Sequence, residues 1–167
     1  MNPYAKFLGK RDPLREFMKT PGRISTLIRG LSQKELAKRP APGKWSILEI
    51  ITHLAETEMV MACRSRWIAF EDDPTLVPFD QDKWAQGWAR EKEPVSEIFE
   101  RFRLLRRAQA RLFRGASKAD YRRAGYHQER GRITLKMQLE TIAGHDLNHL
   151  AQIRRLASQL RAVRRSS

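Results

Sequence analysis

Three histidines are the residues of this chain whose types and spacing could do chemistry. His145 and His149 stand four residues apart, so on a helix their imidazoles would project from one face and could bind the same ion. His53 belongs to another segment, shortly after a candidate helix start at Trp45 and Ser46. Three neutral imidazoles leave one metal coordination position free, which is typical of catalytic rather than structural zinc sites.

The alternative for each histidine is a hydrogen-bonded core residue, which is the commoner role of a histidine on an apolar helix face. His149 continues an apolar stripe that would hold its imidazole away from water. The stripe consists of Leu139, Ile142, Ile153, Leu156 and Leu160. Burying an imidazole without a partner is costly, and a second ring on the same face with a third nearby favours metal ligation.

Two glutamates flank His53 at helical spacing. Glu49 lies four residues before it and Glu56 three residues after it, so either carboxylate could support the histidine or accept a proton. The alternatives are that Glu49 completes a helix cap with Ser46 and that Glu56 is a solvated charge. Asp146 stands where the zincin motif needs a glutamate, which argues against peptide hydrolysis.

Length and composition predict one domain over residues 1–167, with a core at about residues 12–160 and a basic tail at 161–167. The single cysteine, Cys63, cannot form an internal disulfide and is expected to be a small buried hydrophobe. The first ten residues hold no signal-peptide core, and no later run is long enough to span a bilayer. We therefore expect a cytoplasmic protein with no membrane contact.

The formal net charge of +14 raises the question of nucleic acid. Helical spacing places five arginines on one arc, which predicts a solvated outer face: Arg103, Arg106, Arg107, Arg111 and Arg114. No aromatic residues interleave with them to stack on bases, so specific nucleic-acid binding is disfavoured. The alternative to an enzyme is a non-catalytic basic protein with weak, salt-sensitive nucleic-acid association, to which a frayed tail would contribute.

Hydrophobic periodicity and capping residues predict an all-α four-helix bundle. The four long helices are expected at about residues 13–31, with a kink or restart at 20–22, and at 46–70, 94–113 and 134–160. Residues 32–35 have capping-box spacing, and 121–133 are expected to form an extended loop or irregular hairpin. An unusually long connection, residues 71–93 around Trp84 and Trp88, joins the second and third helices and is predicted to cover a pocket.

Four segments resemble the DinB-like superfamily. Residues 39–58 are similar to the family's first signature, and residues 145–153, from His145 through His149 to Gln152 and Ile153, are similar to its second. Residues 79–84 and 127–131 are weaker matches. His127, in the second of these, is expected in a loop at the surface or at the rim of the site. The resemblance covers about residues 20–156, and the two histidine motifs in this order are its specific part.

The resemblance implies a four-helix bundle in which His53, His145 and His149 hold a divalent metal, with zinc and nickel both known at such sites. It also implies an enzyme acting on a small-molecule substrate. Family members include bacillithiol- and mycothiol-dependent transferases and a metal-dependent hydrolase, so a low-molecular-weight thiol is a candidate cofactor. Many members are homodimers. The resemblance names no substrate.

Overall fold

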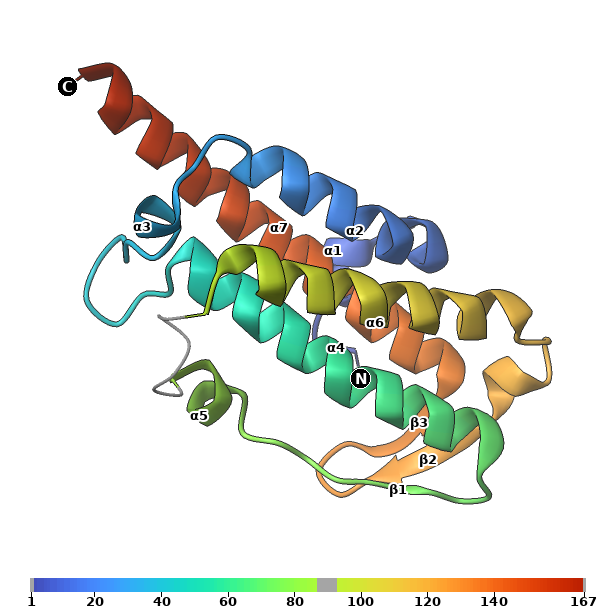
Figure 1. Cartoon of the computed structure of the whole chain (residues 1–167). Coiled ribbons are helices and arrows are strands. Elements are labelled where there is room, and N and C mark those ends of the chain that lie inside the picture. The colour runs from blue at the N-terminus through green and yellow to red at the C-terminus, as the bar shows by residue number, and fades with distance from the viewer. Residues whose placement is uncertain (1, 87–92, 167) are drawn as a thin grey trace.

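A computed structural model of the chain describes residues 2–86 and 93–166. Four long helices form a bundle, as the sequence predicts (Figure 1). They are α2 (Pro13–Ile28), α4 (Ile47–Phe70), α6 (Val95–Gly115) and α7 (Leu135–Ser166). Helix α2 packs against α6 and α7, and α4 packs against the same two helices, so α2 and α4 occupy opposite corners of the bundle. None of the described helices is both long enough and apolar enough to cross a bilayer.

The starts of the long helices follow from their capping residues. Asp12 accepts a hydrogen bond from the backbone N–H of Arg15 at the start of α2. Ser46 and Glu49 form the predicted capping box at the start of α4. Thr134 accepts from the backbone N–H of Met137 at 3.1 Å and so caps α7, as expected. These side chains satisfy backbone donors that the first turn of a helix leaves open.

Shorter elements fill the connections. Helix α1 (Ala5–Leu8) packs on α7, and α3 (Gln33–Leu36) is the short helical turn predicted from its capping box. The connection after α4 is less irregular than predicted, because it contains strand β1 (Thr75–Leu76) and helix α5 (Gln81–Gln86). Trp88 lies outside the described residues.

A three-stranded sheet lies beside α4 and α7. After the 3-10 helix η2 (Asp120–Arg122), strands β2 (Ala124–His127) and β3 (Gly131–Thr134) form an antiparallel hairpin. This confirms the hairpin alternative for the segment before α7. Strand β1 pairs in parallel with β2, so the long connection is tied to the hairpin.

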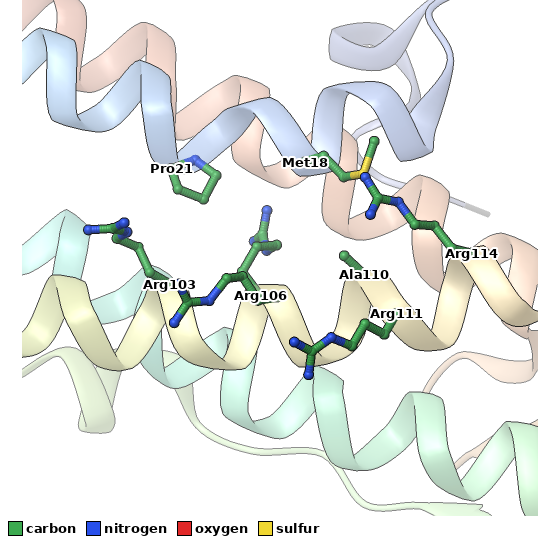
Figure 2. Close-up of a pocket in the computed structure, with 8 residues that line it drawn as sticks. Met18, Pro21, Arg103, Arg106, Ala110, Arg111 and Arg114 are labelled. Carbon is green, nitrogen blue, oxygen red and sulfur yellow. The ribbon is translucent and has the colours of Figure 1, made fainter.

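Of the kink or restart predicted at residues 20–22, the restart does not occur, because helix α2 runs through Pro21 without interruption. A proline in a helix leaves the carbonyl four residues earlier without its N–H donor. Here that carbonyl belongs to Phe17, and it accepts a hydrogen bond of 2.8 Å from Nη1 of Arg106 on α6. Figure 2 shows the Arg106 side chain reaching from α6 toward α2 near Pro21. A side chain from a neighbouring helix thus replaces the missing donor.

Helix α7 continues to Ser166, so residues 161–166 are not the frayed tail that was predicted. Two arginines of this segment bind backbone and side-chain oxygens around α3. Arg161 donates to the carbonyl of Leu27 at 2.7 Å, and Arg164 donates to the carbonyl of Gly30 and to Glu35. The last turns are therefore tied to the end of α2 and to α3.

Ionisation of Glu35 makes the stability of the folded protein depend on pH. Hydrogen bonds from Ser32, joined by the charge and hydrogen bond of Arg164, lower the pKa of Glu35 to about 2. A lowered folded-state pKa stabilises the protein above the usual pKa of a glutamate, and this contribution disappears as the pH falls toward 2. We expect Glu35→Gln to lower the melting temperature at pH 7 but not at pH 2. Glu100→Gln, at an exposed site on α6, is the control, and an equal effect of Glu35→Gln at both pH values would contradict this account.

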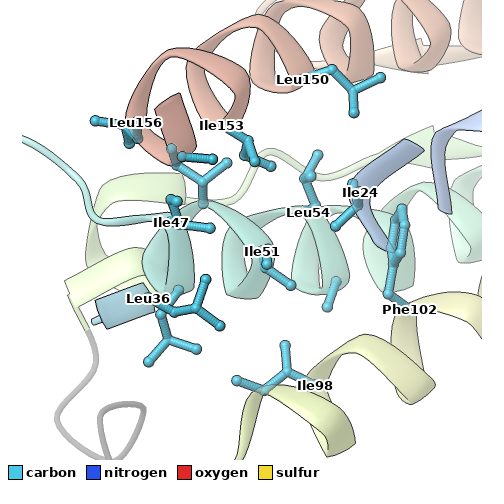
Figure 3. Packing of buried hydrophobic residues seen from close by; sticks show 14 residues of the cluster. Ile24, Leu36, Ile47, Ile51, Leu54, Ile98, Phe102, Leu150, Ile153 and Leu156 are labelled. Carbon is cyan, nitrogen blue, oxygen red and sulfur yellow. The ribbon is translucent and has the colours of Figure 1, made fainter. Parts of the chain in front are cut away.

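The core has two apolar halves. One contains the first half of α4 and the second half of α7 (Figure 3), and its largest buried members include Ile51, Leu54, Phe102 and Ile153. The other lies toward the sheet and includes Phe17, Ile68, Phe113 and Leu139. Between the two halves, α4, α6 and α7 bury a polar layer consisting of His53, Glu58, Arg106, Gln109, His145, Asp146 and His149. The candidate site belongs to this layer.

Candidate metal centre

The bundle brings the three predicted histidines together. His53 projects from α4, and His145 and His149 project from α7. The Nε2 atom of His145 lies 2.9 Å from Nε2 of His53 and 3.1 Å from Nε2 of His149. All three side chains are buried, and one nitrogen of each lies within 4.8 Å of the others. The site therefore joins two helices that are separated by more than 60 residues of chain.

The hydrogen bonds of His149 indicate which of its nitrogens could bind a metal. Its Nδ1 lies 3.1 Å from Oε1 of Gln152, an oxygen that can only accept, so Nδ1 carries the proton. Burial lowers the pKa of His149 to about 3, with a further contribution from the charge of His145. The ring is then neutral at cellular pH, and its Nε2 presents a lone pair to the other two imidazoles.

Three converging ring nitrogens fit a transition metal. Lone pairs at this separation repel one another unless a proton or a cation lies between them. Two nitrogens bound to one tetrahedral zinc ion at about 2.1 Å lie about 3.4 Å apart, close to the separations of the Nε2 atoms. The donor set is all nitrogen, which suits zinc, nickel, copper or iron better than the oxygen-preferring magnesium or calcium.

A buried charge network, which the sequence did not predict, lies next to His145. Arg106 was expected on the solvated face of α6, but it is 3% exposed and forms ion pairs with Glu58 on α4 and Asp146 on α7. Its guanidinium also lies 3.9 Å from the ring centroid of Phe17. Asp146 follows His145 directly, and its Oδ1 lies 3.9 Å from the His145 Nδ1, beyond hydrogen-bond distance, so the network borders the histidines and adds negative charge beside them.

The pKa shifts of the two carboxylates differ. Burial raises the pKa of Glu58, although the charge of Arg106 acts in the opposite direction. Burial alone would also raise the pKa of Asp146, but the charge and hydrogen bond of Arg106, together with the neighbouring His145, outweigh it, and the pKa is lowered. Asp146 is thus the carboxylate that is most strongly held in its charged form beside the histidines.

The two flanking glutamates have different surroundings. Glu49 accepts from the backbone N–H of Ser46 and forms an ion pair with Arg39, and these contacts fit its alternative role as a helix cap. Glu56 is half-buried, and the exposed area of its Oε2 atom is close to zero. The pKa of Arg101 on α6 is raised mainly by the hydrogen bonds that Arg101 donates to Glu93, and the negative charge of Glu56 contributes further. At least one carboxylate oxygen of Glu56 is thus withdrawn from solvent.

Trp45 covers the site from the side of α4. Its ring stacks on His149, with 6.3 Å between centroids and an angle of 11°, and lies 4.9 Å from the ring of His53. A recess of about 390 Å³ opens beside it and reaches His149, with Lys44 and Arg155 among its lining residues. It is bounded by residues 40–45 and by α4 and α7, and none of residues 71–86 of the predicted cover lines it, while residues 87–92 lie outside the described part of the chain.

The N-terminal segment covers the site from the other side, which the sequence did not predict. The Tyr4 ring lies edge-on to His145 with 5.1 Å between centroids. This contact depends on Gly144, because a Cβ atom there would lie 2.6 Å from the Tyr4 carbonyl oxygen. Only a glycine lets the segment before α1 cross α7 this closely.

We expect Gly144→Ala to displace the N-terminal segment and to destabilise the fold by about 1–3 kcal/mol, the usual range for overpacking. Hydrogen exchange should then rise at residues 4–8 and around His145. Gly22→Ala on α2 is a matched control, because its Cβ would meet nothing within 4 Å and alanine favours the helix. Unchanged exchange at residues 4–8 in Gly144→Ala would show that the close approach is unimportant.

Two other expectations were wrong. His127 was expected in a loop at the surface or the rim, but it lies on β2 and is buried, and its Nδ1 accepts from the backbone N–H of Glu129. Burial lowers its pKa, and the charges of Arg64 and Arg130 lower it further. Cys63 was expected to be buried, but it is exposed on α4.

Comparisons with known proteins agree with this architecture. Residues 16–153 match the family model described as the DinB superfamily. A relative from Oceanobacillus iheyensis, named "Putative metal-dependent hydrolase", is 25% identical over 146 residues, which cover 87% of this chain and 84% of the relative. A relative of the same name from Geobacillus kaustophilus is 26% identical over 134 residues, covering 80% of this chain and 75% of the relative.

A solved structure has a similar fold. Its description reads "YfiT from Bacillus subtilis is a probable metal-dependent hydrolase with an unusual four-helix bundle topology". It superposes with a TM-score of 0.81 at 20% identity and covers 88% of this chain and 85% of that chain. At this identity the likeness is one of fold.

Proposed function

The chain belongs to the DinB superfamily, and on this premise we propose that it is a metal-dependent hydrolase acting on a small molecule, with His53, His145 and His149 as the metal ligands. The observation that carries the proposal is the convergence of three buried Nε2 atoms from two helices. The names of the relatives support the same class of reaction. Zinc or nickel is the metal that we propose.

The roles of the chain's own residues follow from their contacts. His53, His145 and His149 would hold a divalent metal through three neutral imidazoles, and the metal would supply Lewis-acid chemistry that activates water near neutral pH. Gln152 holds the His149 ring with its Nε2 lone pair directed inward. Trp45 and Tyr4 shield the histidines from bulk water on two sides, which strengthens electrostatic interactions within the site.

The recess at His149 indicates the class of substrate. Lys44 and Arg155 line it, together with the apolar side chains of Ile50 and Leu156. We therefore propose a small substrate that carries a carboxylate or phosphate and an apolar part. A low-molecular-weight thiol with carboxylate groups would satisfy the same two cations, so thiol transfer is the second candidate reaction.

Glu56 is our proposed proton acceptor. It lies one helical turn after His53 on α4, and its Oε2 atom is shielded from solvent. Glu56→Gln should lower kcat by about 10²-fold or more, because general-base catalysis usually contributes that much, while metal content stays the same. An unchanged kcat would remove Glu56 from the mechanism.

We also propose that two copies associate through an apolar stripe on α4. Met59, Trp67 and Phe70 are all exposed on this helix, and Cys63 lies among them on the same side. Light scattering should give twice the chain mass, and Trp67→Glu should give the single-chain mass. A wild-type protein that is monomeric at high concentration would contradict this proposal.

The reaction is tested with untagged protein. Elemental analysis should find about one zinc or nickel ion per chain, and the loaded protein should hydrolyse members of a set of small anionic esters and amides. Lys44→Gln with Arg155→Gln should raise KM without loss of metal, whereas Lys118→Gln at an exposed site should change neither. Turnover only when a thiol and an electrophile are both supplied would favour the transferase reaction instead.

A further inference from the structure

A row of four arginines on α6 forms a charged strip on the described surface that the candidate metal site does not use. Its members, Arg103, Arg107, Arg111 and Arg114, are all exposed. At 100° per residue they fall within about 80° of arc, and at 1.5 Å per residue they extend over about 16 Å of helix. Arg106, on the inner edge of this row, is turned into the bundle instead.

The row borders a groove between α2 and α6, which we call the arginine groove. It has a volume of about 380 Å³, and Met18, Pro21 and Ala110 supply its apolar surface. Figure 2 shows Arg103, Arg111 and Arg114 spread along α6 and not gathered around one point. A groove with charges distributed in this way suits an extended anion better than a compact one.

The four arginines of the row lack carboxylate partners within the described parts of the chain. Arginines elsewhere on the surface do have them, for example Arg23 with Glu16, Arg101 with Glu93 and Arg164 with Glu35. Like charges three and four residues apart on a helix repel one another and destabilise it. Binding of an anion with several charges would relieve this repulsion between the arginines. That relief adds to the binding free energy and favours a multivalent anionic ligand.

The spacing and chemistry of the row favour phosphate groups. Arginine binds phosphate through two parallel N–H donors. A duplex strand presents a phosphate about every 3.4 Å of helix axis, so a row of about 16 Å would face several of them. Among the residues that the structure describes, no aromatic side chain lines the groove, so stacking on unpaired bases has no support there.

We propose that the arginine groove is a docking surface for the phosphate backbone of duplex nucleic acid, without recognition of base sequence. It lies on the face between α2 and α6, whereas the recess at His149 is lined from residues 40–45, α4 and α7. The two surfaces share no lining residue. Binding at the groove therefore does not depend on the proposed hydrolase activity.

The test is the salt dependence of binding to a labelled mixed-sequence duplex, followed by fluorescence anisotropy. Four phosphate contacts predict a slope of log K against log salt of about −3.6, and Arg107→Gln with Arg111→Gln should reduce it to about −1.8. Affinity at fixed salt should fall about tenfold or more. The matched control is Arg122→Gln with Arg132→Gln, which removes the same net charge from η2 and β3.

Three results would overturn the proposal. The first is an equal loss of slope in the control, because binding would then reflect net charge alone. The second is the absence of duplex binding at 50 mM salt. The third is displacement of the duplex by polyglutamate at equal charge concentration, which would identify an acidic protein surface as the partner.

A measurement on the unaltered protein does not depend on the folding of any variant. Arginine modification by phenylglyoxal, read by mass spectrometry, should be slowed by the duplex at Arg107 and Arg111 and not at Arg122 or Arg132. Equal protection of all four would also overturn the proposal. Because metal content and hydrolysis are measured separately, failure here leaves the proposed enzyme activity standing.

Discussion

His149→Ala is expected to abolish metal binding and turnover together. Replacement of residues that only support a ligand usually weakens metal binding 10- to 100-fold, so removing a ligand should cost at least about 100-fold. Gln152→Ala, which removes the partner of the His149 Nδ1, should fall within that smaller range. Both are measured by elemental analysis after dialysis and by competition with a coloured chelator.

Stability gives a second measurement of the same event. A metal bound only by the folded state stabilises it by about 2.7 kcal/mol when its free concentration is 100 times the dissociation constant. A chelator should therefore lower the melting temperature of the wild-type protein and leave that of His149→Ala unchanged.

The fourth histidine supplies the control. His127 is as deeply buried as the other three but lies on β2, apart from the three-histidine group. His127→Gln should retain about one metal ion per chain, whatever its effect on stability. If His149→Ala bound metal as tightly as wild type, the three-histidine site would be refuted.

Arg106→Met is expected to destabilise the fold by about 3–5 kcal/mol, the usual cost of leaving buried charges without their partner. The substitution strands Glu58 and Asp146 in the interior and removes the donor to the Phe17 carbonyl. Urea unfolding followed by circular dichroism measures the change. Arg107→Met, one residue along and exposed, should change stability by no more than about 0.5 kcal/mol.

The pH dependence of this variant identifies the cause. Without Arg106 the pKa of Glu58 should rise further, because burial already raises it and the opposing charge is gone. A carboxyl whose folded-state pKa is raised destabilises the protein above its unfolded pKa, so Arg106→Met should recover stability as the pH falls toward 5. Adding Glu58→Gln should recover part of the loss at pH 7. A pH-independent loss would instead indicate poor packing of the methionine.

The sequence was sufficient for the features that depend on local patterns. Capping residues such as Ser46 and Thr134 placed helix starts correctly, because a cap acts within three residues of chain. The spacing of His145 and His149 put them on one face, and the bundle brings His53 to them. Their role as metal ligands remains a prediction.

The errors concern contacts between distant segments. Arg106 lies at the edge of the arginine arc on α6. A helical wheel of α6 cannot show that Glu58 on α4 and Asp146 on α7 lie inside the bundle and pair with it. Tyr4 reaches His145 only because Gly144 allows the chain to cross, and nothing local to residue 4 signals this. Helix α4 is buried over most of its surface, so its sequence does not show clearly which narrow side faces solvent. Cys63 lies on that exposed side and was wrongly predicted to be buried.

The hydrogen bond between Arg106 and the Phe17 carbonyl makes two distant positions interdependent in evolution. If Arg106 is lost while Pro21 remains, the Phe17 carbonyl has no donor. If Pro21 is replaced first, the backbone N–H at position 21 supplies that donor, and a later loss of Arg106 costs only its ion pairs with Glu58 and Asp146. Substitutions at the two sites should therefore covary among descendants. Their order should be constrained, with the proline replaced before the arginine.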